Sequence, residues 1–250
     1  MKDRTGFSEK TYRRKIIHQN LRHYRVQIQQ TDLWISTDTD LSTAARERAL
    51  ECRNELEAYI VEHPEFLHTL YPWLDDSPAP EIVRRMIHAG RCAGVGPMAA
   101  VAGAIAEAVG SRLMAQSENV IVENGGDIFV VSPKPIVAAI FAGKSPLSMK
   151  IGVRIDNGNQ PFGLCTSSGT VGHSISFGRA DAVCVFALSC PLADAAATAI
   201  GNRVRTAEDI ASAIAFGRTI DGIQGILIVV GRKIGAWGAM ELVPIAGKRC

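Results

Sequence analysis

The chain has 250 residues, of which 47% are hydrophobic and 21% charged, and its formal net charge is +2. This composition excludes a mainly disordered chain, because disorder goes with few apolar residues and a high net charge. A net charge this small gives no reason by itself to expect a nucleic-acid partner.

The first 30 residues depart from this even balance, because basic side chains gather there. They are Lys2, Arg4, Lys10, Arg13, Arg14, Lys15, Arg22 and Arg25, against only Asp3 and Glu9. Such a segment can bind phosphates or an acidic surface, or it can simply be solvated. Binding of phosphates is supported by nothing in this segment except its charge, so we do not expect nucleic acid as the partner.

The cysteines form no CxxC pair and have no histidine at zinc-finger spacing; they are Cys52, Cys92, Cys165, Cys184, Cys190 and Cys250. Small or apolar neighbours predict that Cys92, Cys165 and Cys184 are free, buried thiols. Together with the lack of a recognisable leader, this predicts a cytoplasmic protein. The uncharged run 92–106 is too short and too rich in alanine and glycine to span a bilayer.

The N-terminal part predicts a hairpin followed by helices. Residues 24–37 alternate apolar and polar positions, which indicates two strands. Asp40 or Ser42 can cap a helix that runs to about residue 61, and a short helix is predicted over 65–70. The proline-rich stretch 75–80 resembles a linker. We therefore expect a basic N-terminal segment over 1–78 and a core over 79–250, or alternatively one continuous domain over 20–250.

Beyond residue 78 the pattern mixes helices and strands. Helices are predicted over 81–88, 97–116, 191–203 and 207–216. Strands are predicted over 119–123, 127–131, 136–142, 151–155, 181–188, 225–230 and 233–237. The order lacks a regular strand–helix–strand alternation, so it predicts an α+β fold with a mixed, largely antiparallel sheet and packed helices.

A polar stretch over residues 166–174 is the first candidate for binding a ligand, because only Val171 in it is apolar. Backbone N–H groups in glycine-rich turns form concavities that bind anions such as phosphate. The candidate cofactor-binding residues here are Thr166, Ser167, Ser168, Gly169 and Thr170. His173 is the candidate catalytic residue, as an acid, a base or a group that orients phosphate; it can equally be an ordinary loop histidine.

Two further segments carry candidate residues. Asn124, Gly125, Gly126 and Asp127 predict a tight hairpin turn, whose glycines also allow a flat ligand to approach the backbone. Asp194 and Thr198 are spaced i,i+4, so both face one side of a helix and could hold a hard divalent cation. The structural alternative is an acid in the first helical turn, favoured by the dipole, and a threonine bonded to the backbone.

The order of these motifs resembles that of the ApbE-like superfamily, the flavin-trafficking proteins that include the FAD:protein FMN transferases. The segments that carry the resemblance are 124–128 (N-G-G-D-I), 166–169 (T-S-S-G), His173 and 193–199 (A-D-A-A-A-T-A). The full pattern, over roughly residues 85–240, is most similar to a sister branch of that superfamily. The resemblance implies the ApbE-like fold, FAD or FMN as cofactor, and Mg2+ at Asp194 and Thr198.

The chain also departs from the transferase pattern in two places. Residues 174–179 replace the I-D-P-x-T-G segment that follows the transferases' histidine, and Met98 and Ala99 stand near the place of their Lys-Gly. We therefore expect a cofactor-binding protein of the ApbE-like type. Its candidate activity is that of a metal-dependent transferase or hydrolase acting on a flavin or other phosphate-bearing cofactor, including FMN-transferase-like chemistry. The alternative is a non-catalytic flavin-binding or carrier protein, and the sequence leaves an oligomer open.

Overall fold

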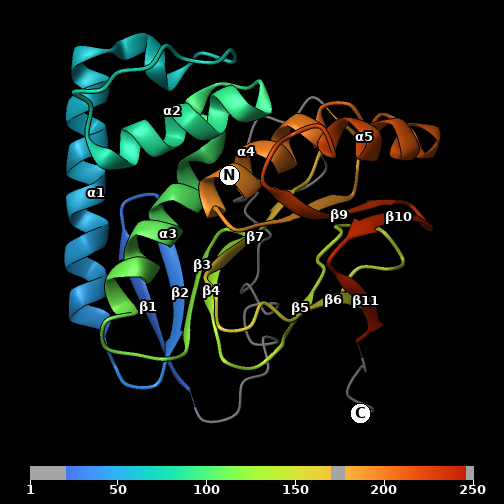
Figure 1. Ribbon diagram of the computed structural model, residues 1–250, viewed down its shortest axis with the longest axis horizontal. Helices are drawn as coiled ribbons and strands as arrows, with labels where there is room; N and C mark the ends of the chain where they lie inside the picture. The colour runs from blue at the N-terminus through green and yellow to red at the C-terminus, as the bar shows by residue number, and fades with distance from the viewer. Residues whose placement is uncertain (1–20, 170–177, 246–250) are drawn as a thin grey trace, which may run out of the picture.

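The computed structural model describes residues 21–169 and 178–245, which form three layers (Figure 1). Helices cover one face of an eight-stranded sheet, and a three-stranded sheet packs against the other face. The helices are α1 (Ser42–Glu62), α2 (Glu81–Ala93), α3 (Val101–Leu113), α4 (Cys190–Gly201) and α5 (Ile210–Gly217), with short 3-10 turns η2 (Pro64–Leu67), η3 (Pro97–Ala100) and η4 (Ala207–Asp209).

The large sheet has the strand order β1-β2-β3-β4-β7-β8-β9-β10, and each neighbouring pair is antiparallel. Its strands are β1 (Arg22–Ile28), β2 (Thr31–Thr37), β3 (Val120–Asn124), β4 (Asp127–Val131), β7 (Phe162–Ser167), β8 (Ala182–Ala187), β9 (Ile223–Val230) and β10 (Lys233–Gly238). The small sheet, in the order β11-β6-β5, contains β5 (Ile136–Ala139), β6 (Ile151–Ile155) and β11 (Glu241–Pro244). The predicted α+β class is therefore confirmed.

Side-chain alternation along the central strands produces two separate cores. Phe129 and Cys165 face the helices and belong to the larger core, whereas Leu164 and Cys184 face the small sheet and belong to the second core. Both faces of the large sheet are thus buried at its central strands, which explains why β8 is hydrophobic at every position. The helix-facing side is the one that carries the candidate site.

The N-terminal hairpin is part of the large sheet. Strand β2 pairs with β3 over Leu33–Thr37, and Val26 and Leu33 pack in the same core as Val120. Sheet and core therefore continue across the expected boundary near residue 78. No single helix in the described ranges is long and apolar enough to cross a membrane; α2 with Pro97–Leu113 meets that criterion only as a pair bent by 104°.

Several sequence expectations differ from the structure. The largest difference concerns β7. Its last two residues, Thr166 and Ser167, are expected in a polar loop, but the strand lies between β4 and β8 at the centre of the sheet. The sequence of β7 does not look like a strand, because it contains glycine and hydroxyl residues. Its side chains also enter a core on each face of the sheet, so the usual alternation of apolar and polar residues is missing. Helix α2 runs to Ala93 and ends at Gly94, whose φ of 73° places it in the left-handed conformation typical of a helix end. Strand β11 was not predicted.

Candidate functional site

The candidate residues from three distant parts of the chain meet on the helix-facing side of the large sheet. Asn124 and Asp127 lie opposite each other at the β3–β4 turn, and Ser167 ends β7, the next strand. Alternation places Asp127 on the face of Phe129 and Ser167 on the face of Cys165. Helix α4 packs on this face against β7 and β4.

The turn between β3 and β4 is the hairpin that the sequence predicts. Gly125 and Gly126 have φ values of 71° and 120°, which residues with a side chain rarely adopt. A Cβ on Gly125 would meet no atom of the described residues within 4 Å, so these residues leave the backbone of the turn accessible on that side. The Asn124 side chain is instead fixed, because its Nδ2 donates to the carbonyl of Ala102, 3.1 Å away.

Asp194 caps helix α3 from the neighbouring helix α4. Its Oδ2 accepts the backbone N–H of Gly103 at 2.9 Å, and the N–H of Ala102 also bonds to this carboxylate. These are N–H groups of the first turn of α3, which have no partner within their own helix. The structural alternative placed Asp194 in the first turn of its own helix; that detail is wrong, since Asp194 is the fifth residue of α4 and the first turn of α4 has no acidic residue. Thr198 lies one turn further on, half-buried.

Asp127 and Asp194 form an electrostatically coupled pair of carboxylates. Burial raises the pKa of Asp127 from 3.8 to about 7, and the charge of Glu123 raises it as well. Hydrogen bonds from the Cys165 side chain and the Thr166 N–H lower this pKa, but by less than burial raises it. Burial, and then the charge of Asp127, raise the pKa of Asp194 well above its ordinary range. Within the described ranges neither carboxylate forms an ion pair with lysine or arginine. Two desolvated like charges of this kind favour binding of a proton or a cation.

The number and type of side chains that could act as metal ligands decide which cation suits Asp127 and Asp194. Among residues 21–169 and 178–245, no three His, Cys, Asp or Glu side chains converge to hold a metal ion. A closed zinc site needs such a set, whereas Mg2+ commonly uses one or two carboxylates and completes its shell with water and phosphate oxygens. Asp127 and Asp194 are carboxylates of the kind that a Mg2+ site uses.

The polar segment after Cys165 is only partly the loop that the sequence predicts. Thr166 and Ser167 belong to β7, and the N–H of Gly169 donates to the carbonyl of Ala180 at 3.0 Å, so it is not available to an anion. The Oγ of Ser167 is buried and has no hydrogen-bond partner among the described residues. A buried hydroxyl without a partner is unusual and suits a ligand contact. Ser168 also lies in the described part; Thr170 and His173 lie outside it.

The pKa of Asp127 predicts how stability depends on pH. Because the folded protein holds this proton more tightly than the unfolded chain, the contribution of Asp127 to stability is full below pH 3.8 and is lost as the pH rises toward about 7. The side chain of Asp127→Asn cannot ionise. We therefore expect the melting temperature of this variant, measured with a chelator, to rise relative to that of the wild type as the pH rises. Parallel pH profiles for the two proteins would contradict this assignment.

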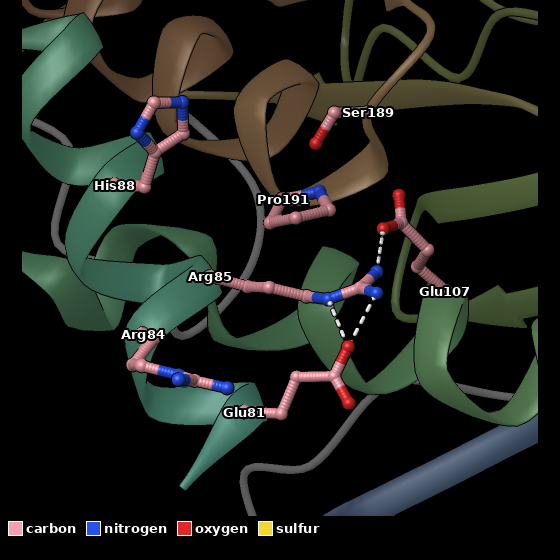
Figure 2. Close-up of a pocket in the computed structure, with 7 residues that line it drawn as sticks. All are labelled: Glu81, Arg84, Arg85, His88, Glu107, Ser189 and Pro191. Carbon is pink, nitrogen blue, oxygen red and sulfur yellow. Dashed lines mark hydrogen bonds and ion pairs between the residues drawn. The ribbon is translucent and has the colours of Figure 1, made fainter. Parts of the chain in front are cut away.

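Sequence reasoning missed Glu107, which positions the start of α4. Its Oε2 accepts the N–H of Cys190 at 2.7 Å, and its Oε1 pairs with Arg85 at 2.6 Å. The sequence did contain a signal for this role, because Glu107 is the one acidic residue of α3. Figure 2 shows this carboxylate in a shallow recess of about 400 Å³ lined by Glu81, Arg84, Arg85, His88, Glu107, Ser189 and Pro191. None of the expected site residues lines this recess.

Comparisons with known proteins agree with this architecture. A model of the family described as AbpE bacteria matches residues 14–235. The UPF0280 protein of Methanosarcina acetivorans is 42% identical over 227 residues, which cover 89% of each chain. The UPF0280 protein of Methanocaldococcus jannaschii is 44% identical over 226 residues, covering 88% of this chain and 92% of that one.

Solved structures show the same fold. The flavin transferase ApbE from Vibrio cholerae superposes with a TM-score of 0.56 at 14% identity, over 88% of this chain and 97% of that one. The apo flavinyl transferase ApbE of Pseudomonas stutzeri gives the same TM-score and identity, over 87% and 94%. At this identity the likeness concerns the fold, which is the ApbE-like fold that the sequence predicts.

Proposed function

The chain belongs to the AbpE bacteria family of ApbE-like proteins, and from this premise we propose that it binds a flavin nucleotide, FAD or FMN, together with Mg2+. The binding site would be the helix-facing end of β3, β4 and β7 and the adjoining side of α4. The observation that carries the proposal is the coupled pair Asp127 and Asp194, two desolvated carboxylates without a basic partner in the described part of the chain.

Each part of the site has a distinct task in this proposal. Asp194 and Thr198 would hold Mg2+, with Asp127 beside them, and the ion would neutralise the charge of the carboxylates and of the ligand's phosphate oxygens. Gly125 would leave the backbone of the turn open to the ligand. The hydroxyl of Ser167 would donate a hydrogen bond to it.

The proposed activity is that of a metal-dependent transferase or hydrolase acting on this phosphate-bearing cofactor. Asp127, with its pKa of about 7, can exchange a proton near neutral pH, and His173 is proposed to orient the phosphate. The proteins with similar structures carry the names flavin transferase and flavinyl transferase, which supports transfer as the class of reaction.

A non-catalytic carrier of the same cofactor is the second candidate. It is favoured by residues 174–179 and by Met98 and Ala99, which replace two segments of the transferase pattern. It is also compatible with Asp194 using one oxygen to cap α3. Incubation with FAD and Mg2+ separates the two candidates: an enzyme produces FMN, free or attached to protein, and AMP, whereas a carrier returns intact FAD.

The hydroxyl of Thr198 allows a test of binding that is independent of catalysis. We expect Thr198→Val, which keeps the side-chain shape, to weaken Mg2+-dependent FAD binding by about tenfold, as loss of a metal-supporting group typically does. The measurement is quenching of flavin fluorescence at increasing Mg2+.

The matched control is Thr219→Val. The Thr219 hydroxyl is exposed and bonds only locally, to the carbonyl of Phe216 at 2.7 Å. We expect this variant to bind FAD as the wild type does. Equal binding by both variants and the wild type would contradict a role for Thr198 in holding the ion.

A further inference from the structure

Two buried cysteines from distant parts of the chain touch where α4 meets β7. The Sγ atoms of Cys165 and Cys190 are 3.6 Å apart, and the thiol of Cys165 also donates to the carbonyl of Cys190 at 3.4 Å. Both residues are completely buried, with 0% exposure. Cys165 comes immediately before the candidate segment, and Cys190 begins the helix that carries Asp194.

The backbone of Cys190 is held in place by two neighbouring elements, α3 and β7. Glu107 accepts its N–H, and Gly103 of α3 packs so closely that a Cβ there would lie 2.6 Å from the carbonyl oxygen of Cys190. On β7, a Cβ at Gly163 would collide with the Cα of Cys190, so only glycine permits this approach. The two sulfur atoms, 3.6 Å apart, would have to approach each other by about 1.5 Å to reach the disulfide bond length of about 2.05 Å.

We propose that Cys165 and Cys190 are a redox-active pair that forms a disulfide in the folded protein and so ties β7 to the start of α4. The bond would close a covalent ring around residues 166–189. This ring contains Ser167 and the rest of the candidate phosphate segment. The inference stands on the contact between the two sulfur atoms and does not depend on the identity of the ligand.

A small peroxide is the oxidant that such a buried pair could receive. The sulfur of Cys190 attacks one peroxide oxygen, the O–O bond breaks, and a sulfenic acid and water form. The sulfur of Cys165 then attacks the Cys190 sulfur, its thiol proton leaves with the departing hydroxyl, and the disulfide and a second water result. Two thiols are oxidised and one hydrogen peroxide is reduced to two waters.

The recess of Figure 2 lies directly next to Cys190 in the chain, since Ser189 and Pro191 both line it. Burial raises the pKa of Cys190 to about 11 and raises the pKa of Cys165 well above its ordinary value, so few thiolates exist at neutral pH. The reaction should accordingly be slow, and faster in alkaline solution.

Peptide mapping of the full chain after peroxide treatment tests the proposal. Because Cys92 is exposed, the experiment uses the Cys92→Ser background. The folded protein is treated, its free thiols are alkylated in denaturant, and it is digested without reductant. We expect a linked peptide that joins Cys165 to Cys190, its reversal by reductant, and a higher melting temperature for the oxidised form.

Matched variants show whether the link is specific. Cys165→Ala should abolish the linked peptide, whereas Cys184→Ala, which removes an equally buried thiol from the other face of the sheet, should leave it. Alkylation of both Cys165 and Cys190 after treatment of the folded protein would overturn the proposal. So would sulfinic acid in place of the disulfide, or an oxidised form that melts below the reduced one.

Discussion

Replacing Asp194 by asparagine is expected to weaken Mg2+ binding by about tenfold or more while leaving the fold intact, since outer-shell losses alone reach that size. The variant removes the charge on which affinity for a hard cation depends. It keeps an oxygen that can accept the N–H of Gly103, and asparagine caps a helix as well as aspartate does. Because burial and the charge of Asp127 raise the pKa of Asp194, its charge is disfavoured in the folded protein without Mg2+, so losing that charge should not lower stability.

Calorimetric titration of Mg2+ into protein saturated with flavin nucleotide measures this effect. Asp209→Asn is the control, because Asp209 caps a different helical turn through Thr206 and lies outside the site. The control should bind Mg2+ as the wild type does. Indistinguishable isotherms for Asp194→Asn and the wild type would mean that Asp194 is only the cap of α3.

Replacing Phe129 by alanine is expected to produce the largest loss of stability, about 3–5 kcal/mol. Phe129 is 1% exposed and lies on β4, two residues after Asp127 and on the same face. Its ring packs against Gly110 of α3, where no Cβ could be accommodated. The variant would leave a cavity between the sheet and the helix that Asp194 caps.

Urea denaturation of Phe129→Ala measures the change in the free energy of unfolding. Tyr71→Ala is the control, because it truncates an aromatic side chain that is 79% exposed, and such changes are usually within about 0.5 kcal/mol. A loss for Phe129→Ala no larger than for Tyr71→Ala would contradict the packing of α3 on β4.

The sequence allowed the fold class and several elements to be predicted because their signals are local. The hairpin β1–β2 and the helix Ser42–Glu62 follow from periodicity, although the N-cap is Leu41 without a side-chain capping bond, and Asp40, one residue earlier, accepts the N–H of Ser42. The N-G-G-D turn follows from the need for positive φ at both glycines. The ApbE-like family was also predicted correctly, from motifs spread over roughly residues 85–240.

What could not be predicted depends on contacts between distant segments. That Asp194 caps α3 rather than α4 follows from the packing of the two helices, and nothing next to Asp194 in the sequence encodes it. Strand β7 was missed because its central place became apparent only from its neighbours. Cys92 was predicted to be buried from its small neighbours, but it lies on the solvent face of α2 and is exposed. The contact of Cys165 with Cys190 likewise needs the fold.

Native mass spectrometry of freshly purified protein, before and after addition of FAD and Mg2+, tests the central claim most directly. We predict a species whose added mass equals one flavin nucleotide with Mg2+, and its loss on chelation or in Asp194→Asn. A protein that retains no flavin under any of these conditions, while remaining folded, would contradict the proposed cofactor site.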